Sequence, residues 1–303
     1  MSEAIIALRN HLHLGAYQQV INQLSQRNLS SSNYEQDPNV LIQKCLLYRA
    51  YLGQAKYNLI LTDLEPTASS PTELQAIRTL AQLQQFQTKS QLSSRPHLAA
   101  ARALVAEPVN LVNPQVVVSV ATIFYRLGQL EEALRTLAHC PKDLECLALT
   151  IQTLLFLDRT DLAQREVANL KSWAEDDSLA VLMEAWVNLR LGGSKYRDAL
   201  YIFEELAQAS PVPTIKLLTS QAICNLHLGR LPEAESLLLE ALDKDSNDPD
   251  VLANMVVCST LMQKPSEVRA RYLNQLREAA PSHPLVATLD HQDAMFDECA
   301  AKA

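Results

Sequence analysis

The side chains that could perform chemistry in this 303-residue chain do not form a catalytic or metal-binding pattern. His11 and His13 are two residues apart on a predicted helix, so they point in different directions and do not suit a shared metal. Cys140 and Cys146 lack a second pair at zinc-ligand spacing. His139, beside Cys140, resembles a nucleophile and its base, but nothing in the sequence orients the imidazole. We therefore predict no metal site and no activated nucleophile.

The acidic stretch 243–250 (DKDSNDPD) is similar to the first half of a calcium-binding loop. The similarity fails because Asp248 stands where the turn needs glycine, and Asn254 stands where a glutamate should chelate. We interpret the stretch as a loop between helices, with aspartates that cap the next helix. Neighbouring carboxylates such as Glu131 and Glu132 lie on exposed helical turns and do not face each other as an acid–base pair. The sequence thus predicts no enzyme and no cofactor.

The helices that position these residues are marked by the glycines. Only six glycines occur, and five of them end a Leu-Gly step, at Gly15, Gly53, Gly128, Gly192 and Gly229, while Gly193 doubles the fourth. Each step closes one apolar-periodic stretch and opens another. Glycine is favoured where a helix ends with positive φ. No glycine is left for a phosphate-binding loop, so the usual kinds of nucleotide site are excluded.

The spacing of these steps indicates repeated helical hairpins. The glycines are 38 residues apart from Gly15 to Gly53 and 37 apart from Gly192 to Gly229, with Asp158 taking the place of a glycine midway between Gly128 and Gly192. These intervals bracket the 34-residue tetratricopeptide period. Alanines fall where paired helices must approach closely, as at Ala222, Ala234 and Ala241, and prolines separate the units.

We therefore predict an all-α fold, a tetratricopeptide-like α-solenoid in which antiparallel helix pairs form a right-handed superhelix. A single domain is expected over 1–303. The first helices are expected at 5–13 and 17–25. The region 84–112 fits the repeat poorly and is predicted as two helices, 72–88 and 97–107, and a last helix at about 285–299 is expected to cap the open end.

Composition narrows the class of partner. The formal charge is −8 and the pI is about 5.4, which argues against nucleic acid and against direct docking on anionic lipid. The longest apolar run, 116–125, is too short to span a bilayer. The six cysteines are scattered, as is typical of reduced, buried thiols. The expected location is the cytosol.

The first helix of each tetratricopeptide pair lines the concave side of the stack, and repeat positions 5, 9 and 12 share one face of that helix. We call the fifteen residues at these positions of the later units the inner wall: Val118, Thr122, Tyr125, Ala148, Gln152, Leu155, Leu182, Trp186, Leu189, Thr219, Ile223, Leu226, Asn254, Cys258 and Leu261. None is charged, an outcome that chance would give about one time in thirty.

Two interpretations of the uncharged inner wall remain open. These helices could simply be more buried than the repeat assumes, or the wall could form an apolar trough that a partner segment covers. In the second case Trp186 is the strongest anchor, because aromatic residues dominate binding hot spots. The first units place Arg9 and Arg49 among Ile5, Leu12, Cys45 and Leu52 at these positions, so that end is expected to bind something more polar.

Several stretches resemble the epsilon subunit of coatomer, the coat of COPI vesicles. They run in the same order over nearly the whole chain: LYRAYL (47–52), PTELQAIR (71–78), LECLALTIQ (144–152), LDRTDLA (157–163), ALYIF (199–203), EALDKDS (240–246), RYLNQL (271–276) and SHP (282–284). The loops 30–38 and 84–112 depart most from the family pattern.

The resemblance implies a non-enzymatic coat subunit that binds and stabilises the C-terminal domain of the alpha subunit as a stable heterodimer. The family's solenoid curls around a protruding segment of that partner. The coat supports Golgi-to-endoplasmic-reticulum and intra-Golgi transport, and its contact with Golgi membranes and vesicles is indirect. Together with the inner wall, this implies affinity from apolar area and from hydrogen bonds to side chains such as Gln152 and Thr122.

The alternative is a free tetratricopeptide adaptor or co-chaperone that grips acidic C-terminal tails. Such adaptors need Lys, Arg and Asn on the concave wall to pair with carboxylates. The central units offer no basic residue at those positions.

Overall fold

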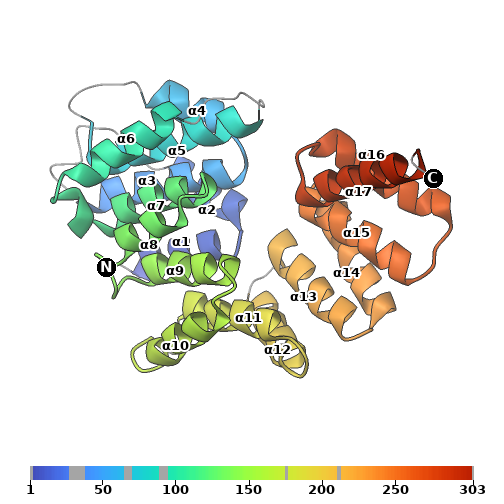
Figure 1. The fold of residues 1–303 in the computed structure, drawn as a ribbon. Coiled ribbons are helices and arrows are strands. Elements are labelled where there is room, and N and C mark those ends of the chain that lie inside the picture. Colours follow the sequence, from blue (N-terminus) through green and yellow to red (C-terminus); the bar gives the residue numbers. More distant parts are fainter. Residues whose placement is uncertain are drawn as a thin grey trace. The chain divides into compact units, whose positions relative to one another are not determined.

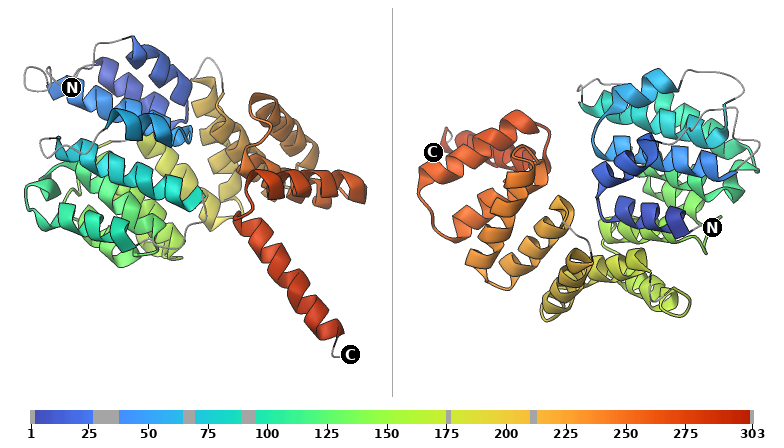
Figure 2. Two further views of the ribbon diagram at one scale, coloured as in Figure 1. Left: turned by 90° about the horizontal axis from the view of Figure 1, so that it is seen from above. Right: turned by 180° about the vertical axis from the view of Figure 1, so that it is seen from behind.

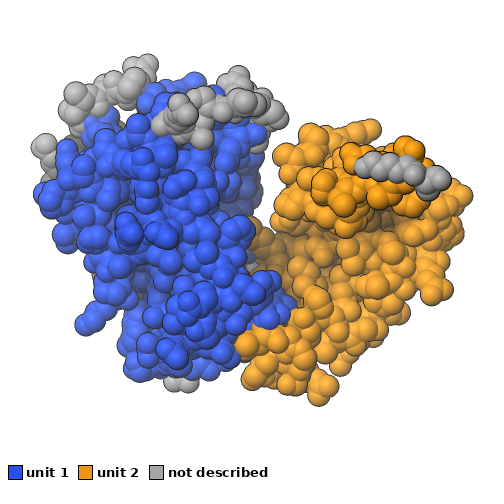
Figure 3. Space-filling model, in the orientation of Figure 1, with its two compact units in different colours: residues 1–190 blue, residues 191–303 orange. Residues whose placement is uncertain are grey.

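The computed structural model describes residues 3–26, 38–64, 70–88, 95–174, 177–209 and 213–301. Within these ranges the regular structure is helical throughout and no strand is formed, as the sequence predicts. The chain divides into two compact units, unit 1 over residues 1–190 and unit 2 over residues 191–303 (Figures 1 and 3). The single domain expected from the sequence stays a prediction.

Unit 1 is built from short antiparallel helices joined by tight turns (Figure 1). Its helices are α1 (Glu3–His13), α2 (Tyr17–Ser25), α3 (Pro38–Gly53), α4 (Tyr57–Asp63), α5 (Thr72–Thr88), α6 (Arg95–Ala106), the 3₁₀ turn η2 (Asn110–Val112), α7 (Pro114–Arg126), α8 (Leu130–Leu137), α9 (Leu144–Phe156), α10 (Thr160–Leu170) and α11 (Ser178–Leu191), which ends at the boundary of the unit.

The helices predicted for the first hairpin and for the region 72–107 are confirmed. The first hairpin has the expected turn, and α5 and α6 lie in the region that fits the repeat poorly, with α5 covering the predicted residues 72–88. The segment 89–94 lies outside the described residues.

The core of unit 1 consists of several small apolar clusters, each shared by helices that are close in sequence. One cluster joins α1, α2 and α3, the next joins α3, α4 and α5, a third joins α5 to α8, and a fourth joins α7, α8 and α9. Alanines allow the close approach within pairs, since Ala121 of α7 and Ala133 of α8 are fully buried. Each helix thus packs mainly on its neighbours in sequence, which is the arrangement of a repeat solenoid.

Side chains in the sequence set the helix ends. The carboxylate of Asp143 accepts hydrogen bonds from the backbone N–H groups of Glu145 (3.1 Å) and Cys146 (3.0 Å) and so caps the start of α9. Asp158, after α9, has φ of 60° and replaces a glycine in the turn, as predicted. Gly53 differs from the expectation, because the positive φ of its turn falls on Ala55; a Cβ on Gly53 would lie 2.5 Å from the Tyr17 ring.

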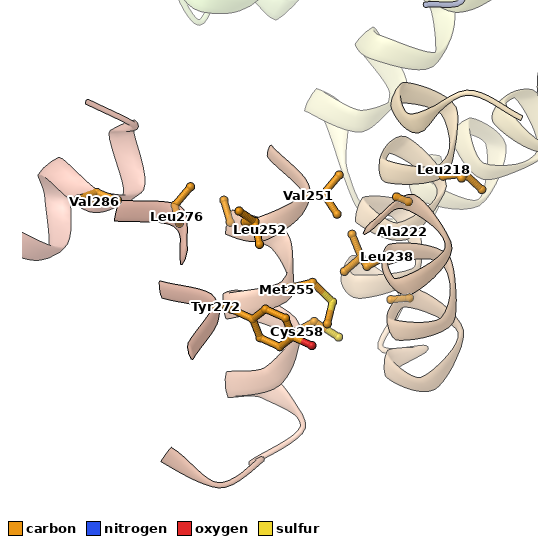
Figure 4. Close-up of a cluster of buried hydrophobic side chains, with 13 residues drawn as sticks. Leu218, Ala222, Leu238, Val251, Leu252, Met255, Cys258, Tyr272, Leu276 and Val286 are labelled. Carbon is orange, nitrogen blue, oxygen red and sulfur yellow. The ribbon is translucent and has the colours of Figure 1, made fainter. Parts of the chain in front are cut away.

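Unit 2 contains α12 (Lys195–Gln208), α13 (Ile215–His227), α14 (Leu231–Lys244), α15 (Pro249–Leu261), α16 (Ser266–Ala279) and α17 (Pro284–Ala300). One apolar cluster joins α13 to α17 (Figure 4). The three alanines expected at the close approach of α13 and α14, namely Ala222, Ala234 and Ala241, are fully buried in it.

The last helix packs on unit 2 only through its beginning. Val286 is buried in the shared cluster and Leu285 packs partly against it, whereas every residue of α17 from Asp290 onward is exposed. In Figure 2, α17 (red) extends away from the other helices of unit 2. A cap at this end is therefore formed by the first turns of α17 alone.

Candidate protein-binding site

The inner wall divides between the two units. Nine of its residues lie on α7, α9 and α11 of unit 1, and the other six lie on α13 and α15 of unit 2. In unit 1, the members on successive helices bring their side chains to one surface, where five of them border a common hollow.

The hollow has a volume of about 450 Å³ and is open to solvent. The term hollow refers below to the surface that seven residues line: Tyr125 of α7; Gln152, Leu155 and Phe156 of α9; and Trp186, Leu189 and Arg190 of α11. Its exposed surface is mainly apolar. The repeat predicts inner-wall residues at spacings of four and three along each helix. This spacing places their side chains on one face of the helix.

Phe156 and Arg190 are the two lining residues that the repeat positions did not predict. The Phe156 side chain is 67% exposed, and its ring meets that of Tyr125 edge to face with centroids 5.7 Å apart. Phe156 is the last residue of α9 and precedes the Asp158 turn. The sequence feature that could have predicted Phe156 is a large apolar residue next to a turn, one position after the inner-wall residue Leu155.

Arg190 provides the single formal charge of the hollow. Its guanidinium donates a hydrogen bond to the Asp158 carboxylate at 2.9 Å, and both side chains are largely exposed. The basic group at the edge of the hollow is therefore already paired with an acidic group of the same unit.

Four predicted inner-wall residues in unit 1 contribute little to the hollow. Leu182 is only 7% exposed, and Ala148 is buried, so both side chains pack inside the chain. Val118 packs against the α7–α9 cluster. The Thr122 hydroxyl donates to the Val118 carbonyl oxygen at 2.7 Å, so its donor is engaged within α7, and its expected hydrogen bond to a partner stays a prediction.

The inner-wall residues of unit 2 are similarly mixed. Thr219 is 7% exposed and Cys258 is buried, whereas Leu261 is exposed. Ile223 and Leu226 are half-buried, and Leu226 packs against the unit 2 cluster. The interpretation that some of these helices are simply more buried than the repeat assumes therefore holds for the buried members of both units.

The N-terminal end of unit 1 has a different arrangement at the same repeat positions. Arg49 of α3 donates to the Glu145 carboxylate of α9 at 2.7 Å, and His13 Nε2 of α1 lies 3.0 Å from the other oxygen of Glu145. Arg49 also reaches the side chain of Gln115 at 3.4 Å. His13 and Glu145 are 132 residues apart, so unit 1 curves until its first and ninth helices are side by side (Figure 1). We call Glu145, His13, Arg49 and Arg9 the Glu145 cluster.

The Glu145 cluster stabilises a buried carboxylate. Glu145 is 6% exposed, and burial alone would raise its pKa. The positive charge of Arg49, then the hydrogen bond from His13 and the charge of Arg9, outweigh burial, so the pKa of Glu145 lies below its ordinary value. Among the described residues, Nε of Arg9 and Nδ1 of His13 are buried without a hydrogen-bond partner.

The expectation that the first units bind something more polar stays a prediction, and the geometry shows that Arg49 is engaged within the chain. Ile5, Leu12 and Cys45 are buried, and Arg49 is already bound to Glu145 of the same chain. Sequence reasoning missed Glu145, although a lone glutamate in the apolar run 144–152 is the kind of residue that needs a buried partner.

In the part of the chain that is described, no three His, Cys, Asp or Glu side chains come together as a metal site. None of the described helices has the length and hydropathy needed to cross a bilayer.

These features define a tetratricopeptide-like scaffold: the helices are paired, helices adjacent in sequence share apolar clusters, and an apolar hollow spans successive inner helices. A solved tetratricopeptide repeat protein from Parabacteroides merdae superposes with a TM-score of 0.59, at 14% identity, over 90% of this chain and 96% of that chain. That similarity concerns the fold alone.

The sequence comparisons define the class further. The family model for the coatomer epsilon subunit matches residues 1–303. Coatomer subunit epsilon-1 of Arabidopsis thaliana is 36% identical over 92% of this chain and 90% of its own length. Coatomer subunit epsilon of Dictyostelium discoideum is 31% identical over 95% of each chain. The chain belongs to the coatomer epsilon subunit family and is a structural component of the COPI coat rather than an enzyme.

Proposed function

We propose that this chain binds and stabilises the C-terminal domain of the alpha subunit, with the hollow of unit 1 as the central contact. In this role it supports Golgi-to-endoplasmic-reticulum and intra-Golgi transport. It acts in the cytoplasm and reaches Golgi membranes and vesicles only through the coat.

One observation carries the proposal. Tyr125, Leu155, Phe156, Trp186 and Leu189 come from three successive inner helices and border one open, mainly apolar hollow. A stable subunit interface requires such a surface, because obligate interfaces are the more hydrophobic ones. Phe156 and Trp186 supply the aromatic area that hot spots use. The proposed partner surface is therefore an apolar segment that inserts into the hollow.

The adaptor alternative receives less support from the hollow. A site for acidic tails needs unpaired basic groups to bind carboxylates. Arg190 is the only charged residue of the seven that line the hollow, and it is paired with Asp158.

The two tryptophans of the chain provide a matched test. Trp186 lines the hollow, whereas Trp173 is exposed outside it, after α10. We expect Trp186→Ala to weaken binding to the alpha C-terminal domain by about 2 kcal/mol, roughly 30-fold. Trp173→Ala should leave the affinity within about twofold. The measurement is titration calorimetry with the purified full chain and the alpha domain.

Phe156→Ser separates binding from folding. Because the side chain is 67% exposed, its removal should change the free energy of unfolding little while weakening the complex at least about tenfold. Equal affinities for the wild-type, Trp186→Ala and Phe156→Ser chains, with melting temperatures intact, would remove the hollow from the interface.

A further inference from the structure

The C-terminal helix presents a long apolar stripe that unit 2 does not use. Among the described residues of α17, only Val286 is buried, and everything from Asp290 to Ala300 is exposed. Met295 is 54% and Phe296 is 72% exposed. Large apolar side chains at neighbouring exposed positions typically mark a contact surface.

The stripe continues the face by which α17 packs on unit 2. Leu285, Leu289 and Phe296 are spaced by four and seven residues and so share one side of the helix, with Cys299 at its border and Met295 more than a quarter of a turn away. Leu285 contacts the unit 2 cluster, and Leu289 is half-buried. Three further turns then present the same face to solvent, which is the anchor pattern of a helix that lies in a groove.

The charge of α17 limits what can cover that stripe. The helix carries Asp290, Asp293, Asp297 and Glu298 and contains no Lys or Arg. Asp290 pairs with Arg277 of α16 at 2.6 Å, whereas no ion pair joins the other three carboxylates to a described residue. An anionic bilayer would repel this helix. A second copy of α17 would bring like charges together, which also disfavours association between copies.

We propose that the exposed part of α17, residues 290–300, is a docking helix for another protein chain of the coat, whose groove has an apolar floor and a rim of Lys or Arg. Phe296 fills the floor of that groove, and Met295 lies at one side of it. Asp293 and Asp297 flank the Phe296 side of the helix, face the basic rim and provide the electrostatic complementarity that orients the helix. This inference rests on membership in the coat and does not depend on the hollow of unit 1.

The test places a photoreactive benzoylphenylalanine at position 296 of the full chain within the purified, complete coat complex. Ala294 is two residues earlier and on the opposite side of the helix, so the same group there is the matched control. We expect the 296 probe to cross-link to another coat chain at least about tenfold more strongly than the 294 probe. The attached peptide should lie next to Lys or Arg residues. The yield should fall as NaCl is raised from about 0.1 to about 0.5 M.

A second variant checks the charges. Asp293→Asn with Asp297→Asn, combined with the 296 probe, should reduce the cross-link several-fold and remove most of its salt dependence. The proposal is overturned if the 296 probe reacts only within its own chain, only with a second copy of it, or no more than the 294 probe. Loss of alpha binding through the hollow leaves the 296 result unaffected in any coat complex that contains the chain, so the two proposals can fail separately.

Discussion

Two regions of unit 1 use the same repeat positions in opposite ways. At the N-terminal end, Arg49 projects from an inner helix and binds Glu145 of α9, which closes the inner side of the first helices. Further along, Tyr125, Leu155 and Trp186 project from inner helices and border an open hollow. A charged inner residue can be satisfied by one buried partner within the chain, whereas a row of apolar residues needs a larger surface to cover it.

This contrast assigns separate roles to the two regions. The Glu145 cluster holds α1 and α3 against α9, so it acts on the stability and curvature of unit 1. The hollow contributes little to the fold at its exposed residues, and we propose that it acts on the partner. Mutations in the first region should therefore change unfolding, and mutations in the second should change binding.

The largest effect is expected from Glu145→Ala. The variant leaves Arg49, and His13 when it is protonated, without the carboxylate that compensates their burial, so we expect unit 1 to lose about 3 kcal/mol of unfolding free energy. Denaturant unfolding measures the loss, and hydrogen exchange should show faster exchange in α1 and α3. Glu184→Ala is the control, because Glu184 pairs with a half-exposed Lys171 and such pairs contribute about 0–1 kcal/mol.

A double replacement shows whether the charge or the contact matters in the cluster. Arg49→Met together with Glu145→Met removes both charges and keeps apolar volume, so it should recover much of the stability that Glu145→Ala loses. Equal stability of wild type and Glu145→Ala would contradict the role given to the cluster.

A smaller effect is expected from pH. The pKa of Glu145 is lowered in the folded chain, so its ionised form stabilises the fold at any pH above the pKa of an unfolded glutamate, about 4.3. That contribution is lost as the pH falls through and below this value towards the folded pKa. Between about pH 6 and pH 3.5, wild type should lose more stability than Glu145→Gln, by an amount on the order of 1 kcal/mol. Parallel pH profiles for the two chains would sink this assignment.

The sequence predicts the repeats well because they depend on local signals. The Leu-Gly steps, the paired alanines and the aspartate at position 158 each act within one hairpin, and the helix ends follow from them. The aligned inner residues of α7, α9 and α11 also follow from the repeat, which is why Tyr125, Gln152 and Trp186 were found together.

Long-range packing explains what the sequence did not predict. The pairing of Glu145 with His13 and Arg49 depends on how far unit 1 curves, and no hairpin encodes that curvature by itself. Leu182 and Leu189 both lie at inner-wall positions of α11, so the repeat pattern alone could not predict that Leu182 is buried and Leu189 is partly exposed. The exposed end of α17 was missed because an apolar stripe at the end of a chain is equally typical of a cap.

The smallest effect is expected from Arg190→Gln, and it makes the comparison sharper. Arg190 and Asp158 are 51% and 78% exposed, so their ion pair should contribute only about 0–0.5 kcal/mol to stability, far less than the buried pair of Arg49 and Glu145. If the hollow binds an apolar segment, the affinity for the alpha domain should change less than about threefold, with a slightly altered salt dependence. Titration at two salt concentrations measures both quantities. A site that binds acidic ligands depends on the basic residue that pairs with their carboxylates. If Arg190→Gln lost as much affinity as Trp186→Ala, Arg190 would therefore be the main anchor, and the hollow would be a site for acidic ligands.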